Sequence, residues 1–166
     1  MITLAELELH RIVVSKTYAS GELNFSGADF QQAGPLQVDG VAELAGPDIR
    51  VRGSLKTRLS AACDRCLAPI EFQVERSFEL YYRPMASIAR EEEIEVPKDE
   101  LGIGFFSGEG IELADIVTEQ VILSVPMKLV CREDCRGLCP ACGVDLNRES
   151  CRCAPPQSDS PFARFR

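Results

Sequence analysis

The residues of this chain with the most evident chemistry are its eight cysteines, all of which lie in close pairs. The pairs are Cys63 with Cys66, Cys131 with Cys135, Cys139 with Cys142, and Cys151 with Cys153. Four thiolates around one ion require two short loops that each present two sulfurs, and a Cys-x-x-Cys turn is one such half-site. The chain therefore carries the sulfur ligands for two metal sites of four.

The clearest half-site is the sequence CPACG, which contains Cys139 and Cys142. Gly143 follows the second sulfur, where a left-handed backbone lets amide groups turn toward the sulfurs, and Pro140 stiffens the turn. The nearby CRC sequence lies close enough to complete the same site across the loop VDLNRES. This spacing predicts a compact structural zinc knuckle.

Two groupings of the eight sulfurs fit the spacing. In the first, one site is Cys63, Cys66, Cys131 and Cys135, and the other is Cys139, Cys142, Cys151 and Cys153. In the second, one site is Cys131, Cys135, Cys139 and Cys142, and the other is Cys63, Cys66, Cys151 and Cys153. We favour the first grouping because CPACG and CRC together come closest to a self-contained ribbon.

Disulfides, a redox dithiol and an iron-sulfur cluster are the alternatives to zinc. The N-terminal sequence MITLAELELHRIVVSK lacks the basic start, apolar core and cleavage site of an export signal. No apolar run approaches the roughly twenty residues that span a bilayer. We therefore expect a cytoplasmic protein whose cysteines stay reduced and bind two structural Zn²⁺ ions.

The charge of the chain bears on its partners. The formal net charge is -8, and it would become -12 with two four-thiolate zinc sites, since eight thiolates and two divalent ions together contribute -4. Such an acidic protein suits a basic protein partner better than the phosphates of nucleic acid. The part from residue 126 onward is nevertheless slightly basic, so its arginines remain candidates for contact with an RNA backbone.

Alternation of apolar and polar residues predicts an antiparallel sheet in the first half of the chain. From residue 49 to 61 the odd positions are mostly apolar and the even ones include four basic residues, whereas residues 70 to 82 alternate apolar with acidic side chains. These two strands should pair through opposite charges, which places Cys63 and Cys66 at the tip of a long hairpin. A preceding strand opens at Leu36, with Gly40 as a candidate bulge.

The remaining elements are predicted less directly. Residues 7 to 14 suggest a first strand and residues 23 to 25 a short one, while the glycines between 102 and 110 suggest a flexible connection. Apolar spacing predicts a helix over residues 111 to 125, which Pro126 ends. The acidic run at 89 to 100 is expected to be a solvated loop or a docking strip.

Together these features predict an α+β fold, with an antiparallel sheet or meander packed with one main helix and followed by a zinc-knuckle segment. We expect a β-rich domain over 1–125, a cysteine-rich zinc-binding segment over 126–153, and a flexible tail over 154–166. His10 is the only histidine and no nucleophile-plus-base motif is present, so no catalytic residue is assigned. No membrane contact, small-molecule substrate or other cofactor is expected.

The order of several motifs resembles one protein family. CDRCL after a basic strand, LADIVTEQVILSVPM, CREDCRGLCPACGVDLNRESCRC and the terminal SPFA are together similar to the YceD family of large ribosomal RNA subunit accumulation proteins. The resemblance runs from about residue 36 to the end. It implies a non-enzymatic cytoplasmic factor for ribosome biogenesis, with a large-subunit ribosomal protein or precursor ribosomal RNA as partner. A zinc-ribbon regulator that binds nucleic acid and a thiol redox enzyme are the alternatives.

Overall fold

The computed structural model describes residues 1–87 and 102–153. The predictions made for the acidic run at 89–100 and for the tail at 154–166 lie outside these residues. The chain divides into two compact units. The first comprises Met1–Ser60 and the described residues between Glu71 and Val125, and the second comprises Ala61–Ile70 and the described residues from Pro126 onward.

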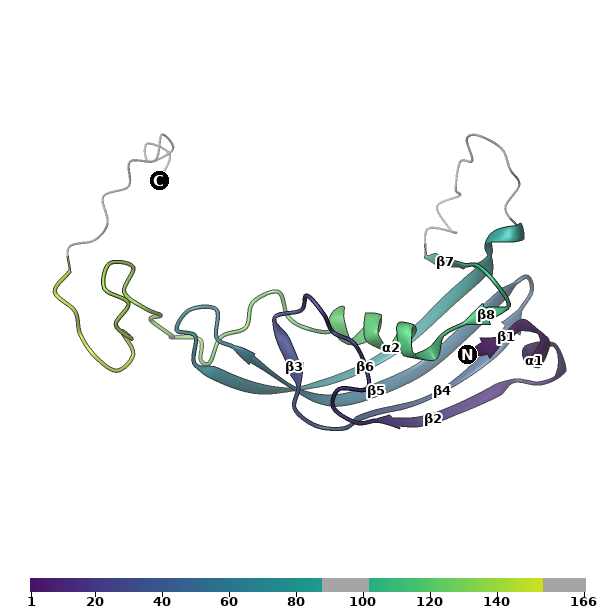
Figure 1. The fold of residues 1–166 in the computed structure, drawn as a ribbon, viewed down its shortest axis with the longest axis horizontal. Coiled ribbons are helices and arrows are strands. Elements are labelled where there is room, and N and C mark those ends of the chain that lie inside the picture. The colour runs from purple at the N-terminus through teal and green to yellow at the C-terminus, as the bar shows by residue number, and fades with distance from the viewer. Residues whose placement is uncertain (88–101, 154–166) are drawn as a thin grey trace, which may run out of the picture. The chain divides into compact units, whose positions relative to one another are not determined.

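A curved sheet forms the first unit. Its strands run in the order β2-β4-β5-β6-β7, with β3 also paired to β5 (Figure 1). The bounds are β2 Ile12–Tyr18, β3 Phe30–Gln32, β4 Leu36–Ala45, β5 Asp48–Ala62, β6 Pro69–Pro84 and β7 Ile103–Phe106. β2 and β5 both pair antiparallel with β4, whereas β7 runs parallel to β6. The sheet is therefore mixed, and the predicted antiparallel sheet is correct except at this edge.

The alternation predicted for β5 and β6 is confirmed. On β5 the side chains of Ile49, Val51, Leu55, Thr57 and Leu59 are all at most 3% exposed. The outer face carries the predicted cross-strand ion pairs, which are Arg50 with Glu79 at 2.6 Å, Lys56 with Glu75 at 3.7 Å and Arg58 with Glu71 at 4.0 Å. Exposed pairs of this kind add little stability, but they fix the charge pattern of the face. The basic stripe of β5 is therefore matched inside the sheet.

Gly40 does not form the predicted bulge. It lies in the unbroken register of β4, opposite Val14 on one side and Gly53 on the other. The reason for glycine is close backbone approach, because a Cβ atom on Gly40 would lie 2.6 Å from the carbonyl oxygen of Arg52. The absence of a side chain here thus lets β4 and β5 pack tightly.

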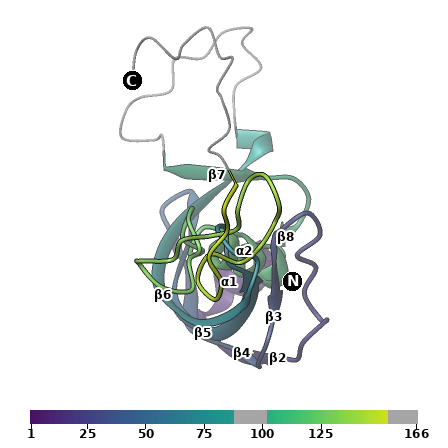
Figure 2. The same cartoon turned by 90° about the vertical axis from the view of Figure 1, so that its left-hand side faces the viewer.

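The main helix, α2, runs Leu113–Ile122 and is shorter than the predicted helix over 111–125. Ile111 belongs instead to β8 (Gly110–Ile111), which pairs with β1 (Ile2–Thr3). The helix buries Ile116, Val117, Gln120 and Val121, and Figure 2 shows it lying inside the curve of the sheet. Ile122 and Leu123 are about half exposed and lie outside the buried stripe of the helix.

The first strand predicted over residues 7 to 14 is wrong in its first half. Leu4–Leu9 form a short helix, α1, because the Thr3 hydroxyl accepts a hydrogen bond from the Glu6 amide while the Glu6 carboxylate accepts one from the Thr3 amide. The strand begins only at Ile12. No strand covers residues 23 to 25, and β3 lies a few residues later.

The connection predicted to be flexible between residues 102 and 110 contains two strands, β7 and β8. It follows a 3-10 turn over Met85–Ser87 and the residues that are not described. Among the described residues, neither helix has the length and apolar character needed to cross a bilayer. The first unit is thus a mostly antiparallel sheet with two short helices, and the predicted α+β class is met only in this coarser sense.

Candidate metal centres

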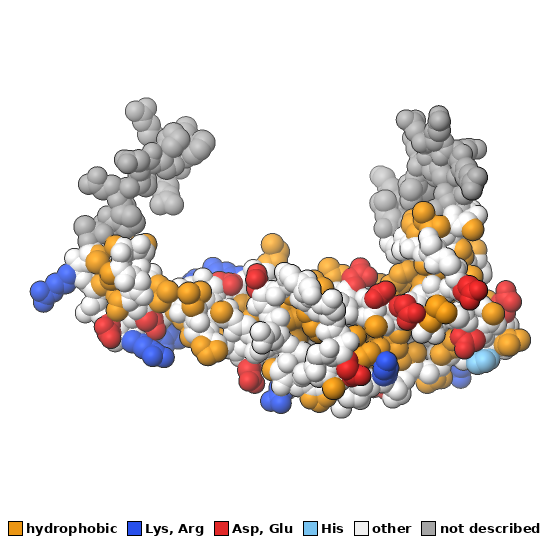
Figure 3. Space-filling view, viewed as in Figure 1, with side chains coloured by type: hydrophobic (Ala, Val, Ile, Leu, Met, Phe, Trp, Pro, Cys, Tyr) orange, Lys and Arg blue, Asp and Glu red, His pale blue; other side chains and the backbone are white. Residues whose placement is uncertain are grey.

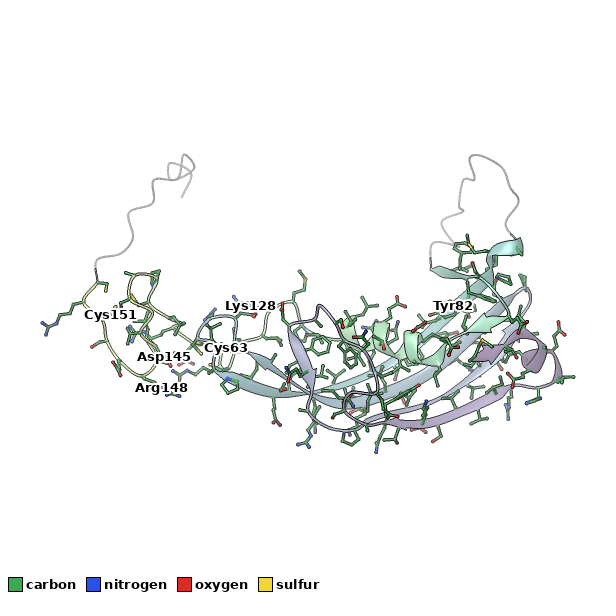
Figure 4. The ribbon with its side chains drawn as sticks, viewed as in Figure 1. Cys63, Tyr82, Lys128, Asp145, Arg148 and Cys151 are labelled. Atoms are coloured by element: carbon green, nitrogen blue, oxygen red, sulfur yellow. The ribbon has the colours of Figure 1, made fainter. Side chains whose placement is uncertain are left out.

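All eight cysteines lie in the second unit, where the structure gathers them into two groups of four. The first tetrad is Cys63, Cys66, Cys131 and Cys135, and the second tetrad is Cys139, Cys142, Cys151 and Cys153. Within each tetrad the sulfur atoms all lie within 4.8 Å of one another, so each could hold a metal ion. Figure 4 labels one member of each, Cys63 and Cys151. The structure brings together the first of the two groupings considered from the sequence.

The sulfur spacing fits a single ion at the centre of the first tetrad. Cys63 Sγ lies 3.9 Å from Cys135 Sγ, and Cys66 Sγ lies 3.7 Å from Cys131 Sγ. Four sulfurs at about 2.3 Å from a tetrahedral zinc ion would lie about 3.8 Å from each other. A disulfide would require about 2.05 Å between bonded sulfurs, and a cluster of several irons would hold the four sulfurs farther apart.

The two Cys-x-x-Cys turns share one backbone conformation. In the turn of the second tetrad, Gly143 has φ of 74° and its amide donates to the Cys139 carbonyl at 2.8 Å. In the turn of the first tetrad, Leu67 has φ of 60° and its amide donates to the Cys63 carbonyl at 2.9 Å. The left-handed backbone expected at Gly143 is confirmed. Leu67 adopts it too, although an L-residue with a side chain is strained there.

In each tetrad, hydrogen bonds from backbone amides stabilise the thiolate of one cysteine and lower its pKa. The Cys66 amide is the main cause that lowers the pKa of Cys63 to about 6, and the Cys142 amide does the same for Cys139, whose pKa also falls to about 6. Desolvation, assisted by neighbouring thiols, raises the pKa of Cys131 to about 12. A hydrogen bond with Cys142 is the main cause that raises the pKa of Cys153 to about 12. Without a cation, each tetrad thus resists carrying four negative charges.

A divalent cation removes that resistance. Thiolates, not thiols, bind metal, and a central ion compensates the repulsion between four thiolates. Four sulfurs also complete a tetrahedral shell, which leaves no open position for water or a substrate. The donor set therefore fits a structural zinc ion, and every sulfur is used.

Two segments far apart in the sequence build the first tetrad. The Asp64 amide donates to the Leu129 carbonyl at 2.8 Å, and the Leu129 amide donates back to the Asp64 carboxylate at 2.6 Å. The Arg65 guanidinium donates to the carbonyl oxygens of Glu133 and Cys135 at 3.1 and 2.7 Å. The predicted hairpin tip is thus joined to the residues after Pro126 by backbone and side-chain hydrogen bonds as well as by the proximity of its sulfurs to Cys131 and Cys135.

The two tetrads differ in burial. Cys63, Cys66 and Cys135 are at most 8% exposed and are surrounded by Ala68, Ile70, Val130 and Leu138. In the second tetrad only Cys139 is buried, while Cys142 and Cys153 are exposed. An apolar shell limits solvent access to a metal site, so an ion in the first tetrad would be the better protected of the two.

Asn147 contacts a sulfur of the first tetrad, and the cysteine spacing alone did not assign it a role. Its side-chain amide donates to Cys135 Sγ at 3.5 Å and to the Asp145 carboxylate at 2.7 Å, while its carbonyl oxygen accepts from the Arg136 amide at 2.8 Å. The Asp145 carboxylate also accepts from the Asn147 amide at 2.9 Å. The only signal in the sequence is the Asp-x-Asn spacing of a local turn, inside the loop VDLNRES that spans the two cysteine pairs of the second tetrad.

Comparison with known proteins identifies relatives in bacteria and plants. An uncharacterized protein of Mycobacterium tuberculosis (strain ATCC 25618 / H37Rv) is 34% identical over 146 residues, which cover 87% of this chain and 66% of the relative. The chain therefore spans just under two thirds of the length of that relative. The "Large ribosomal RNA subunit accumulation protein YCED homolog 1, chloroplastic" of Arabidopsis thaliana is 24% identical over 194 residues, covering 96% of this chain and 58% of the plant protein.

A third relative is the uncharacterized protein YlbN of Bacillus subtilis (strain 168), which is 22% identical over 132 residues and covers 78% of this chain and 72% of its own length. No solved structure matches the chain significantly. The model of the family described as "Large ribosomal RNA subunit accumulation protein YceD" matches residues 51–166. This match covers both tetrads, most of the strand pair that presents Cys63, and helix α2, and the chain belongs to the YceD family.

Proposed function

We propose that this protein is a non-enzymatic cytoplasmic factor that supports the accumulation of large-subunit ribosomal RNA. In this proposal two structural Zn²⁺ ions hold the second unit together, one in each tetrad. The folded protein then acts as a scaffold that binds a large-subunit ribosomal protein, with precursor ribosomal RNA as the second candidate partner.

The tetrads favour a structural role over catalysis. A catalytic zinc ion keeps one position open for water, whereas each tetrad supplies four sulfurs that complete the shell. A dithiol enzyme needs an accessible thiolate, but the two cysteines with the lowest pKa, Cys63 and Cys139, are both buried. These observations support a scaffold.

The charge distribution favours a basic protein as partner. The formal net charge is -8, and the basic stripe on β5 is engaged by carboxylates of β6. Within the described part of the sheet, the basic side chains of β5 are therefore already paired, and association with a basic partner is favoured electrostatically. The pairing of the β5 stripe is the observation that carries the choice of a ribosomal protein over RNA.

One feature of the second unit keeps precursor RNA as a candidate. Its described residues include six arginines and lysines, which are Arg65, Lys128, Arg132, Arg136, Arg148 and Arg152. Several already have partners, since Arg132 contacts Asp134 at 3.3 Å and Arg148 contacts Asp145 at 3.5 Å. Figure 4 shows Lys128, Asp145 and Arg148 on this unit. Fewer than six of these basic side chains are thus available for contact with an RNA backbone.

The test is recovery of tagged, zinc-loaded protein from lysate at low salt, with and without nuclease treatment. We expect a large-subunit ribosomal protein to be recovered in both samples, and depletion of the factor to lower the level of large-subunit ribosomal RNA. Loss of the partner after nuclease would favour the RNA candidate. Failure to recover any large-subunit component would overturn the proposed function.

A further inference from the structure

The first unit contains a groove that none of the preceding roles uses. We call it the Tyr82 groove, a hollow of about 330 Å³. Three aromatic side chains and three carboxylates line it, namely Tyr82, Phe105, Phe106, Glu112, Asp115 and Glu119. The rings come from β6 and β7, and the carboxylates come from the beginning and outer side of α2. Figure 4 labels Tyr82, and Figure 3 shows acidic side chains gathered around β8 and the start of α2.

A glycine on β7 makes room for one of the aromatic rings that line the groove. Tyr82 pairs with Gly104 across the β6–β7 ladder, and a Cβ atom on Gly104 would lie 2.8 Å from two carbons of the Tyr82 ring. The missing side chain therefore makes room for the ring over β7. Phe106 is 8% exposed, whereas Phe105 is 44% exposed and keeps one ring in contact with solvent.

Two carboxylates of the groove lack the ion pairs that carboxylates on β4 and β6 have. Glu43, Glu71, Glu75 and Glu79 on the sheet all form ion pairs with arginine or lysine. Residues 102–125 contain four acidic residues and no arginine or lysine. Glu112 contacts the N-terminal amino group at 3.2 Å, but within the described parts of the chain neither Asp115 nor Glu119 has an ion pair.

The helix dipole stabilises only one of these two unpaired carboxylates. Asp115 lies in the first turn of α2, where a negative charge is favourable, but Glu119 lies near the C-terminal end, where it is unfavourable. Asp115 and Glu119 are also four residues apart, a spacing at which like charges repel. Burial and the charge of Glu119 raise the pKa of Tyr82 to about 12, and its ring is neutral at neutral pH, as that of an ordinary tyrosine is.

We propose that the Tyr82 groove binds an arginine side chain from a basic protein segment. A guanidinium group stacks on the face of an aromatic ring and also binds carboxylates through a planar set of donors, so one side chain satisfies both halves of the groove. The charge of the walls selects a cationic occupant, and the rings distinguish it from a bare metal ion. This inference deepens the proposed function and rests on it for the identity of the biological partner.

The test measures binding of a fluorescein-labelled peptide of alternating arginine and glycine to the full-length, zinc-loaded protein by fluorescence anisotropy. The test variant is Asp115→Asn/Glu119→Gln, which removes two groove charges while keeping side-chain size. The control is Glu8→Gln/Asp29→Asn, which removes two charges from exposed residues outside the groove that have no ion pair within the described residues. Both variants then have the same net charge.

We expect the groove variant to bind the peptide about tenfold more weakly and the control to change by less than about twofold. Phe105→Ala should weaken binding by about threefold through loss of the exposed ring. Circular dichroism and thermal unfolding establish that each variant is folded. If the groove variant unfolds, it is replaced by the single substitution Glu119→Gln, on the exposed side of α2, and its control becomes Glu8→Gln.

Several results would overturn the inference. Equal losses in the groove and control variants would mean that the peptide binds through net charge alone. Equal binding of a peptide with glutamine in place of arginine would exclude a cationic occupant. Self-association that the groove variant abolishes would assign the groove to a second copy of the chain. One further result would separate the two proposals. If the peptide binds at the groove but no large-subunit component is recovered from lysate, the proposed function is wrong and the inference that the groove binds arginine is retained.

Discussion

Removal of two cysteines from one tetrad should empty that tetrad and leave the other filled. The double substitution Cys63→Ser/Cys135→Ser removes two sulfurs of the first tetrad, which lie 3.9 Å apart. Its matched partner, Cys135→Ser/Cys142→Ser, removes one sulfur from each tetrad. Both variants lose the same number of cysteines, so the difference between them reports only the grouping.

The magnitude follows from the ligand count. A structural zinc ion in a small domain is bound with an apparent free energy of about 10–16 kcal/mol at neutral pH. If the four thiolates contribute equally to this free energy, a tetrad with two sulfurs left binds zinc with about 5–8 kcal/mol. This corresponds to a dissociation constant between about 1 µM and 0.2 mM. A tetrad with three sulfurs left is weakened by about 10² to 10³-fold. A chelator of nanomolar affinity removes zinc from both.

The assay is native mass spectrometry of each variant after brief exposure to such a chelator at a concentration that leaves the unmodified protein loaded. We expect one zinc ion in Cys63→Ser/Cys135→Ser and none in Cys135→Ser/Cys142→Ser. The alternative grouping predicts the reverse, with no ion in the first variant and one in the second. That reversed pattern would refute the arrangement of sulfurs described above, and loss of both ions in each variant would show that neither site holds its ion alone.

Four further outcomes follow from the same contacts. Asn147→Asp should weaken zinc binding at the first tetrad by about tenfold, measured by chelator competition, because a carboxylate replaces the amide that donates to Cys135 Sγ. Gly40→Ala should lower the free energy of unfolding by about 2 kcal/mol in urea titration, since its Cβ would lie 2.6 Å from the Arg52 carbonyl oxygen, while Gly102→Ala, with nothing within 4 Å, should change it little. Leu67→Val should be less stable than Leu67→Gly by about 1 kcal/mol in the same titration, because φ is 60° at this position. Zinc should leave the second tetrad, where only Cys139 is buried, before the first tetrad, where three of the four cysteines are buried, so chelation followed by absorbance should show two phases.

The sheet could be predicted where one face is buried and the other is charged. On β5 and β6 the alternation of apolar and charged residues sets both the strands and their pairing, and the ion pair between Arg50 and Glu79 follows from it. The alternation of apolar and polar residues does not predict positions where the close packing of two backbones determines the residue type. A glycine inside a strand can mark either a bulge or a close approach of another backbone. The sequence of β4 alone suggested a bulge, and only the position of Gly53 opposite Gly40 shows that the second reason applies.

Local hydrogen bonds explain the other errors in the fold. The pair Thr3 and Glu6 caps α1, and this signal outweighs the apolar pattern that suggested a strand through Leu7. β7 could not be predicted from its own residues, because its partner β6 lies about twenty positions upstream and pairs in parallel. Long-range pairing of this kind leaves no periodic signal in a short, glycine-containing segment.

The candidate site was more accessible to sequence reasoning than its surroundings were. Cysteine spacing alone indicated the half-sites, since the geometry of four thiolates restricts how two pairs can meet. The hydrogen bonds that orient the sulfurs could not be predicted, because Arg65 and Asn147 act on carbonyl and sulfur atoms from distant segments. The strained backbone at Leu67 was also missed, since glycine is the usual residue there.

The measurement that tests the central claim most directly is the intact mass of the unmodified protein under native, non-reducing conditions. The account predicts two zinc ions per chain and no disulfide, because two tetrads bring eight thiolates within 4.8 Å in groups of four. A chain without metal, whose mass is lowered by two hydrogens for each pair of cysteines, would contradict it.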